Sequence, residues 1–312
     1  MTGHEEQVVL NAMTVDVEDY FQVSAMEPHV PRAAWETTPL RVRANVERIL
    51  ALFAEHGVKA TFFTLGWVAE RHPEMVRRIV AEGHELASHG WEHIRVNTQQ
   101  PEAFRSDVAR TKALLEDIGG VAVNGYRAAS YSIGRDNLWA LDVLADVGYR
   151  YSSSIAPIKH DLYGMQEAPR FAFAAAGGRL AEIPVTTLPL GGRNINCGGG
   201  GWFRLFPYGF SRWALRRINR REGQSGHFYF HPWEIDPEQP RPAGVSAKTR
   251  FRHYLNLQRM EPRLRRLLGD FRWDRMDRVF AHQIESLGDQ RQPQPRVSVT
   301  GEAAGTAGGA GR

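Results

Sequence analysis

The sequence has very little of three features that would each define a class of protein. Cys197 is the one cysteine among 312 residues, so no disulfide can form within the chain and no cluster of thiolate zinc ligands is available. No run of about 18 apolar residues occurs, so no membrane-spanning helix is expected. The first residues, MTGHEEQVVLNAM, lack the basic start and the long apolar stretch of a secretory signal peptide. These absences lead us to expect a cytoplasmic protein.

An excess of charge of one sign is also missing. The 39 Lys and Arg residues nearly balance the 35 Asp and Glu residues, which gives a formal charge of +4. Basic residues are dense only in residues 248–266 and match no nucleic-acid-binding motif, so no nucleic-acid partner is expected. With 42% hydrophobic residues, a chain of this length can bury a large core without disulfides.

What the sequence does contain is a repeated alternation of short apolar runs with amphipathic segments that end at glycine. The amphipathic segments predict helices over residues 41–56, 73–82, 101–118 and 137–147. The apolar runs predict strands over residues 7–16, 58–65, 84–89, 121–127, 149–154, 181–188 and 226–231. This alternation favours an α/β fold with a parallel sheet. Such folds gather their chemistry at the carboxyl ends of the strands.

Three segments depart from this alternation. Residues 194–201, NINCGGGG, are expected to form a loop, and they lack the lysine of a phosphate-binding loop. Residues 248–268 predict an amphipathic segment that packs its apolar side on the rest of the protein and is split into two helices at Pro262. Its arginines leave open a peripheral contact with an anionic membrane surface. Residues 289–312 contain almost no large apolar side chain and are expected to be disordered.

A histidine pair follows the third predicted strand. In GHELASHGWEH, His89 and His93 are four residues apart, a spacing that brings both imidazoles to one side of a helical turn. Two neutral imidazoles and a carboxylate form a common catalytic zinc set that leaves a position for water. The alternative is that both are hydrogen-bonded side chains of the core or the surface.

Three acidic residues end the first predicted strand, in TVDVEDY. Asp16, Glu18 and Asp19 would repel one another unless a cation or an arginine balances them. One of them could bind a metal while another accepts a proton from water. Strand alternation places Asp16 and Glu18 on the same face. A solvated acidic turn is the alternative.

Two further motifs follow the acidic and histidine motifs: GYRAASY around Arg127 and FYFHP around His231. The four motifs occur in the order of the NodB-type polysaccharide deacetylase family (carbohydrate esterase family 4), which the chain resembles over residues 8–234. Residues 16–21, 231–236 and 248–271 are similar to its subgroup associated with exosortase-type exopolysaccharide clusters. The resemblance implies a distorted (β/α)7 barrel over residues 1–240, a basic helical extension packed on it over residues 241–288 and a disordered tail over residues 289–312. It also implies a divalent metal, Zn²⁺ first, with Co²⁺ or Ni²⁺ as alternatives.

The resemblance implies a role for each metal-site residue. His89 and His93 would bind the metal together with an acid of the first motif. The family usually has two adjacent aspartates there, whereas this chain has a separated set. We assign Asp16 as the catalytic base and Asp19 as the third ligand, with Glu18 as the alternative ligand.

The remaining roles concern the proton donor and the substrate. Arg127 would pair with the carboxylate of the base and orient it, and His231 would protonate the departing amine. The carboxylate that usually tunes this histidine is not evident, because serines occupy the corresponding residues 152–154. Three aromatic residues near the motifs are expected to contact the substrate: Tyr131, Trp91 and Trp233.

The function implied by the resemblance is hydrolytic deacetylation of N-acetylated sugar residues in an exopolysaccharide or its precursor. The partner would be an acetylated polysaccharide or oligosaccharide. Two alternatives stay open. One is a hydrolase of the same fold that cleaves another C–N bond, such as that of a cyclic ureide, and the other is a catalytically silent carbohydrate-binding protein.

Overall fold

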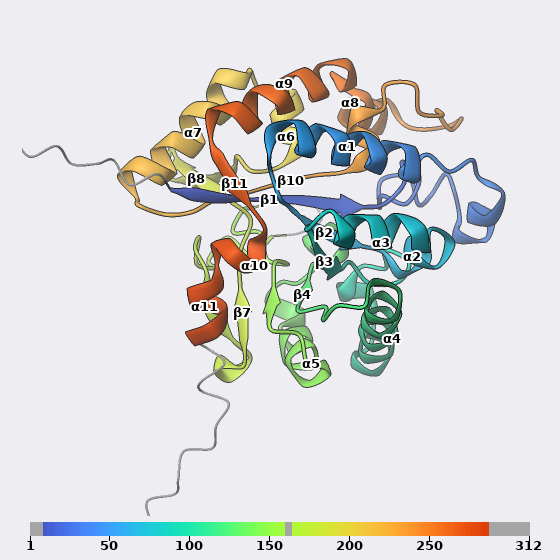
Figure 1. Cartoon of the computed structure of the whole chain (residues 1–312), viewed down its shortest axis with the longest axis horizontal. Coiled ribbons are helices and arrows are strands. Elements are labelled where there is room, and N and C mark those ends of the chain that lie inside the picture. The colour runs from blue at the N-terminus through green and yellow to red at the C-terminus, as the bar shows by residue number, and fades with distance from the viewer. Residues whose placement is uncertain (1–8, 160–163, 287–312) are drawn as a thin grey trace, which may run out of the picture.

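One large sheet organises the chain (Figure 1). The structure is a computed structural model, and it describes residues 9–159 and 164–286. The strands of the large sheet are β1 (Leu10–Val17), β2 (Thr61–Thr64), β3 (Glu85–Ser88), β4 (Gly125–Tyr126), β5 (Tyr151–Ser152), β6 (Phe173–Ala175), β7 (Leu180–Glu182), β10 (His227–Phe230) and β11 (Arg272–Asp274). A separate antiparallel hairpin consists of β8 (Thr187–Leu190) and β9 (Arg193–Asn196).

Seven parallel strands form one continuous row of the sheet, in the order β10–β1–β2–β3–β4–β5–β7. The strand β6 lies antiparallel to β7, and β11 pairs parallel with β1. The seven parallel strands correspond to the seven predicted apolar runs, although the run over residues 181–188 contributes to both β7 and β8. The predicted α/β class with a parallel sheet is therefore confirmed.

Helices connect the strands and cover the outside of the sheet (Figure 1). They are α1 (Val42–His56), α2 (Gly66–Arg71), α3 (Pro73–Ala81), α4 (Pro101–Gly119), α5 (Trp139–Val147), α6 (Gly200–Leu205), α7 (Tyr208–Arg221), α8 (Ala247–Tyr254), α9 (Leu257–Asp270), α10 (Met276–Val279) and α11 (Ala281–Ser286). Short 3-10 helices are η1 (Arg32–Thr37), η2 (Val96–Thr98), η3 (Ala129–Tyr131), η4 (Arg135–Asn137), η5 (Ala176–Gly178) and η6 (Pro232–Ile235). The predicted glycine stop of α1 is confirmed, because Gly57 has a φ of 63°, a left-handed conformation that glycine adopts at little cost.

Both faces of the parallel sheet are buried, as is usual for such sheets. Neighbouring residues of β2 point to opposite faces because strand side chains alternate. Phe62 packs outward against Phe53 of α1, with 6.2 Å between the ring centroids. Phe63 points inward to a second cluster that contains Tyr151 of β5 and Met276 of α10. The C-terminal helices α10 and α11 thus take part in filling the inner side of the sheet.

The amphipathic segment over residues 248–268 breaks at a different place from the one predicted. The break falls between α8 and α9, at Asn256 with a φ of 53°, and Pro262 lies inside α9. A proline inside a helix costs about 3 kcal/mol, but α9 buries a continuous apolar side against the core, which outweighs that cost. The buried residues are Leu257, Met260, Leu264, Leu267 and Leu268.

The glycine-rich segment over residues 194–201 is not a simple loop, which corrects that prediction. It supplies the end of β9 and the start of α6. A Cβ on Gly199 would lie 2.5 Å from the hydroxyl of Tyr229, so the glycine is needed for close packing on β10. The boundary proposed at residue 240 stays a prediction, and the tail over residues 289–312 lies outside the described residues.

Candidate functional site

The chemistry-bearing residues converge at the carboxyl ends of neighbouring strands. Asp16 is the penultimate residue of β1, His89 follows β3, Arg127 follows β4 and His231 follows β10. These strands lie side by side in the part of the sheet that runs from β10 to β4. Asp16, His89 and Arg127 are buried, whereas the side chain of His231 is 20% exposed. His231 is thus the member of the set that solvent can reach.

Glu18, His89 and His93 form a group that could hold a cation. Each offers one ligand atom, and these atoms lie within 4.8 Å of one another. His93 Nε2 lies 3.0 Å from Glu18 Oε2, a buried oxygen without a hydrogen-bond donor among the described residues. His89 Nδ1 lies 2.8 Å from the carbonyl oxygen of Arg127, which orients the ring and leaves Nε2 for the group. A buried carboxylate oxygen that faces two imidazoles fits a divalent metal.

The two histidines reach this group from a loop and not from a helical turn. The strand β3 ends at Ser88, and the next helix along the chain, η2, begins only at Val96. Gly90 and His93 have φ values of 75° and 55°, so the chain folds back between the two imidazoles. A left-handed conformation at a residue other than glycine is strained and recurs at functional sites. The expected convergence is present, but the expected helical turn is wrong.

Burial determines the charge of the group. It lowers the pKa of His89, and it lowers the pKa of His93 well below its usual range, so both imidazoles are neutral and able to bind a metal. Burial also raises the pKa of Glu18 to about 7. A cation between these side chains would favour the ionised carboxylate.

Asp19, the residue assigned as the third ligand, points away from the histidines. Its Oδ1 accepts the backbone N–H of Tyr20 at 2.9 Å, and its Oδ2 accepts those of Arg41 and Val42 at 2.7 and 2.9 Å. Because the latter two N–H groups begin α1, Asp19 stabilises the start of that helix. The structure places Glu18 with the histidines, which corrects the assignment of Asp19.

Asp16 and Arg127 form a buried ion pair beside the group. Arg127 Nη1 donates to Asp16 Oδ1 at 2.6 Å and to Thr14 Oγ1 at 2.8 Å. Its Nε donates to the carbonyl oxygen of Ser153 at 3.3 Å, and its Nη2 donates to the hydroxyl of Ser153 at 3.1 Å. The guanidinium also lies over the ring of Phe63. The carboxylate of Asp16 is thereby fixed in orientation, as the role expected of Arg127 requires.

His231 faces the same acidic residues from β10. Its Nε2 lies 3.4 Å from Glu18 Oε1 and 3.8 Å from Asp16 Oδ2, and its Nδ1 lies 2.8 Å from Glu234 Oε1. Burial alone would lower the pKa of His231, but the charges of Glu18 and Glu234 outweigh it and raise the pKa to about 9. The imidazole is therefore protonated at neutral pH and can donate a proton.

Glu234 is a residue of the site that the sequence analysis missed. It follows His231 by three residues across η6, and Arg204 Nε lies 2.7 Å from its second oxygen, Oε2. Burial would raise the pKa of Glu234, but Arg204 and His231 lower it to about 2. The signal was present as the spacing H-x-x-E in HPWE, whereas the resemblance pointed to residues 152–154. There, Ser153 accepts a hydrogen bond from Arg127 instead.

Arg204 is held in turn by the C-terminal part of the chain. Its Nη1 donates to the carbonyl oxygens of His253 and Leu255 at 2.9 and 2.7 Å, and its Nη2 donates to that of Arg252 at 3.3 Å. These carbonyls lie at the junction of α8 and α9. The C-terminal region therefore supports the carboxylate that supports His231.

Trp233 lies within this arrangement and is only 6% exposed. Its ring stacks with those of His231 and His253, with centroid distances of 5.2 and 4.1 Å. Its Nε1 donates to Glu18 Oε1 at 3.3 Å. Trp233 thus orients two groups of the site and offers no open face to a sugar, which corrects its assignment as a substrate-binding residue.

The other two aromatic residues differ in their surroundings. Trp91 is buried in the core, with the guanidinium of Arg110 3.5 Å from its ring centroid, so its assignment to the substrate is also corrected. Tyr131 lies against Tyr229, with 4.9 Å between the ring centroids, and the guanidinium of Arg127 lies 5.5 Å from its ring. A contact of Tyr131 with the substrate stays a prediction.

The fold and the site together define a class of protein: an α/β protein in which Glu18, His89 and His93 could hold a metal. The carboxylate of Asp16 and the protonated imidazole of His231 lie next to each other at this site. Comparison with known families narrows this class. Residues 34–152 match the family profile "Polysaccharide deacetylase", and residues 153–281 match a domain of unknown function (DUF3473). The first of these matches shows that residues 34–152 carry a polysaccharide deacetylase domain, which confirms the resemblance for this part of the chain.

Individual proteins agree with this assignment. A chitooligosaccharide deacetylase of Rhizobium leguminosarum bv. trifolii is 37% identical over 99 residues, which are 31% of this chain and 43% of the relative. A peptidoglycan-N-acetylglucosamine deacetylase of Bacillus cereus (strain ATCC 14579) is 33% identical over 96 residues, which are 30% and 35% of the two chains. The chain thus spans less than half the length of these relatives.

The fold as a whole is similar to that of a solved structure. A protein of Mycobacterium smegmatis, classed as a polysaccharide deacetylase, superposes with a TM-score of 0.61 at 19% identity and with 93% of both chains covered. The predicted barrel of the NodB type is therefore confirmed.

The two family matches divide the site between them. The deacetylase match contains His89, His93 and Arg127, and the match to the domain of unknown function contains His231 and Glu234. The acidic end of β1 precedes both matches. The complete site therefore exists only where the two matched segments and β1 meet.

Proposed function

We propose that the chain is a metal-dependent deacetylase that hydrolyses N-acetyl groups of sugar residues in an exopolysaccharide or its precursor. The observation that carries this proposal is the position of Glu18, which faces His93 on one side and the protonated His231 on the other. A metal site and a proton donor therefore address the same small region. The names of the curated relatives, which refer to chitooligosaccharide and N-acetylglucosamine, support an N-acetylated sugar as substrate.

The metal in this proposal is held by Glu18, His89 and His93. Two imidazoles and one carboxylate are a frequent catalytic zinc set, so Zn²⁺ is the first choice, with Co²⁺ or Ni²⁺ as alternatives. When bound, such an ion acts as a Lewis acid that activates water and polarises a carbonyl group.

The side chains of the protein move the protons. Oδ1 of Asp16 is bound to Arg127, so Oδ2 accepts a proton from the water whose oxygen forms the new bond to the acetyl carbon. His231 gives its proton to the sugar nitrogen as the C–N bond breaks. Acetate and a free amine leave, and one water molecule is consumed.

The two alternatives lack a specific supporting observation. A catalytically silent carbohydrate-binding protein is favoured if neither Asp19 nor Glu18 reaches the histidines, but Glu18 does so. Cleavage of a cyclic ureide remains an outcome of the assay, since the same residues could serve it. The cytoplasmic location and the exopolysaccharide context stay predictions.

The test is acetate release from chitooligosaccharides by the full chain after removal of metal, before and after addition of zinc or cobalt. We expect release to depend on added metal and to be abolished in His89→Ala. His282→Ala is the matched control, because His282 is an exposed residue of α11 and should leave release unchanged.

Other results would select between the alternatives. Binding of the oligosaccharide without acetate release under any metal would contradict the proposal in favour of a silent binder. Hydrolysis of a cyclic ureide in preference to the acetylated sugar would contradict the substrate class but retain the metal site.

A further inference from the structure

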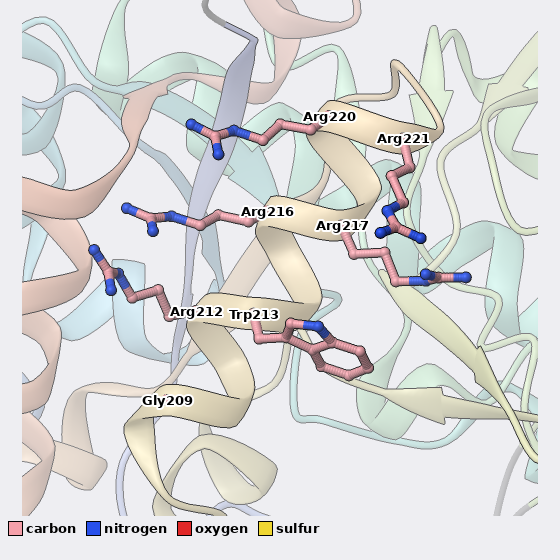
Figure 2. A pocket seen from close by; sticks show the side chains of 7 residues that line it. All are labelled: Gly209, Arg212, Trp213, Arg216, Arg217, Arg220 and Arg221. Carbon is pink, nitrogen blue, oxygen red and sulfur yellow. The ribbon is translucent and has the colours of Figure 1, made fainter.

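Among the residues that the structure describes, no helix is long and apolar enough to cross a membrane. One face of the protein nevertheless combines exposed aromatic side chains with a high density of positive charge. We call it the arginine face, and it is formed by α7 with the adjoining α6. Figure 2 shows its charged side chains extending to both sides of α7: Arg212, Arg216, Arg217, Arg220 and Arg221.

Much of the charge on this face is uncompensated. Arg212 pairs with Asp270 at 3.0 Å, whereas Arg216, Arg217 and Arg221 have no acidic partner in residues 9–159 and 164–286. Like charges four residues apart on a helix repel one another, as Arg212 with Arg216 and Arg217 with Arg221 do. An anion bound to this face would relieve the repulsion.

A row of aromatic rings lies beside the arginines. Trp202 stacks on Phe206 with 5.6 Å between centroids, Phe206 lies 4.7 Å from Phe210, and Phe210 lies 5.8 Å from Trp213. Trp213 and Leu205 are 46% and 44% exposed. Exposed Trp and Leu side chains next to arginines are typical of helices that lie in the interfacial layer of a membrane.

The shape of the arginine face favours a flat ligand. The hollow between the arginines has a volume of about 370 Å³, and every residue that lines it belongs to α7 (Figure 2). A polymer chain is usually held from two sides, which a hollow lined by one helix does not provide. Arg216 and Arg220 also border a second hollow with Val9 and Val58, at the amino ends of β1 and β2. The arginine face therefore extends toward the amino ends of these strands. The candidate site lies at their carboxyl ends and stays accessible when the face is bound.

We propose that the arginine face docks on the surface of an anionic lipid bilayer, with Arg216, Arg217 and Arg221 on headgroup phosphates and Trp213 in the interfacial layer. The residues for this contact lie on α7 and not in residues 248–268, the segment considered from the sequence. The apolar side of that segment is buried, and its Arg265 pairs with Glu55 and Glu261. This proposal does not depend on the catalytic one.

The test is co-sedimentation of the full chain with phosphatidylcholine vesicles that do or do not contain phosphatidylglycerol. We expect binding only to the anionic vesicles, and weaker binding at high salt because the charges are exposed. Removal of the three unpaired charges, in Arg216→Gln/Arg217→Gln/Arg221→Gln, should weaken binding about a hundredfold, since each arginine at an anionic surface contributes about fivefold. Trp213→Ala should weaken it further.

A matched control removes the same number of charges from exposed arginines that pair with acids elsewhere: Arg105→Gln/Arg135→Gln/Arg278→Gln. Equal loss of binding in this control would overturn the proposal, because net charge alone would then explain the binding. Failure to bind anionic vesicles would overturn it as well, and so would arginine-dependent binding to a soluble anionic polysaccharide or oligonucleotide but not to vesicles. Thermal unfolding of each variant shows that it is folded.

Discussion

His231 Nε2 lies 3.4 Å from Glu18 Oε1 and 3.8 Å from Asp16 Oδ2. After their proposed roles, we call Asp16 with Arg127 the base side of the site and His231 with Glu234 and Arg204 its acid side. The two arginines are anchored differently. Arg127 contacts Asp16 directly and is also held by the hydroxyl of Thr14 in β1 and by the hydroxyl and carbonyl oxygen of Ser153 after β5. Arg204 acts on His231 only through Glu234, and backbone carbonyls at the α8–α9 junction hold it. The base side is therefore held by residues of the barrel, whereas the acid side depends on contacts with the C-terminal region.

This difference gives a physical role to the segment that matches a domain of unknown function. Residues 153–281 contain the proposed proton donor His231, its carboxylate partner Glu234 and Arg204, which holds that carboxylate. A charge as deeply buried as that of Glu234 requires a partner, because an unpaired buried charge costs several kcal/mol. The segment thus completes the site from its acid side, and the variants below test the two sides separately.

The largest effect is expected at the proposed metal ligand between the two sides of the site, in Glu18→Gln. Loss of the ligand carboxylate should reduce both bound metal and acetate release to background. Asp19→Asn is the matched variant, since it removes the neighbouring charge but should retain metal and most activity, with a loss of about 1 kcal/mol of stability from the weakened start of α1. Metal content by mass spectrometry distinguishes them, and loss of metal in Asp19→Asn would restore the original assignment.

The next effect is expected on the acid side, in His231→Ala. Removal of a general acid should lower kcat by about 10²- to 10⁴-fold, while bound metal stays unchanged because Glu18, His89 and His93 hold it. Parallel measurement of kcat and of metal content checks this separation. If the metal is lost together with activity, His231 is a metal ligand, and its assignment as a separate proton donor is wrong.

A smaller effect is expected in Glu234→Gln, which removes charge from the partner of His231. Since the carboxylate of Glu234 raises the pKa of His231, its loss should lower that pKa and move the alkaline fall of kcat/KM to lower pH. The rate should fall by about 10- to 100-fold, as for other groups that orient a site histidine. Glu238→Gln, at an exposed position of the same segment, is the control, and an unshifted pH profile would refute the role of Glu234.

The smallest effect is expected in His253→Ala, at the far end of the acid side. The variant removes the ring that stacks on Trp233 but leaves every reacting group in place. Residues coupled to a site without touching it change its energetics by about 0.5–2 kcal/mol, which corresponds to about a two- to thirtyfold lower kcat. Comparison of its kcat with that of His282→Ala checks this. An unchanged kcat in a folded protein would show that this contact of the C-terminal region does not affect proton donation by His231.

Part of this picture could be predicted from the sequence. The alternation of apolar runs predicted the seven parallel strands because burial on both faces leaves a strong local pattern. The side chains of His89, Arg127 and His231 could be placed together because each ends a strand, and carboxyl ends of parallel strands share one edge. The three-residue strand β11 was missed, since so short a segment carries no periodic signal.

The remainder depended on contacts between distant parts of the chain. Local spacing did not distinguish Glu18 from Asp19, because their difference arises from the N–H groups of α1, which bind Asp19. No motif of the sequence marks Arg204, and its role appears only in its contacts with Glu234 and with the carbonyl groups of the α8–α9 junction. The sequence alone determined the parallel strands and the residue types of the site, because these follow from local pattern, whereas the barrel followed from the resemblance to a family. Only the tertiary structure decided which acid meets the histidines and what tunes the proton donor, because the pairing of a buried charge is a property of the groups that surround it.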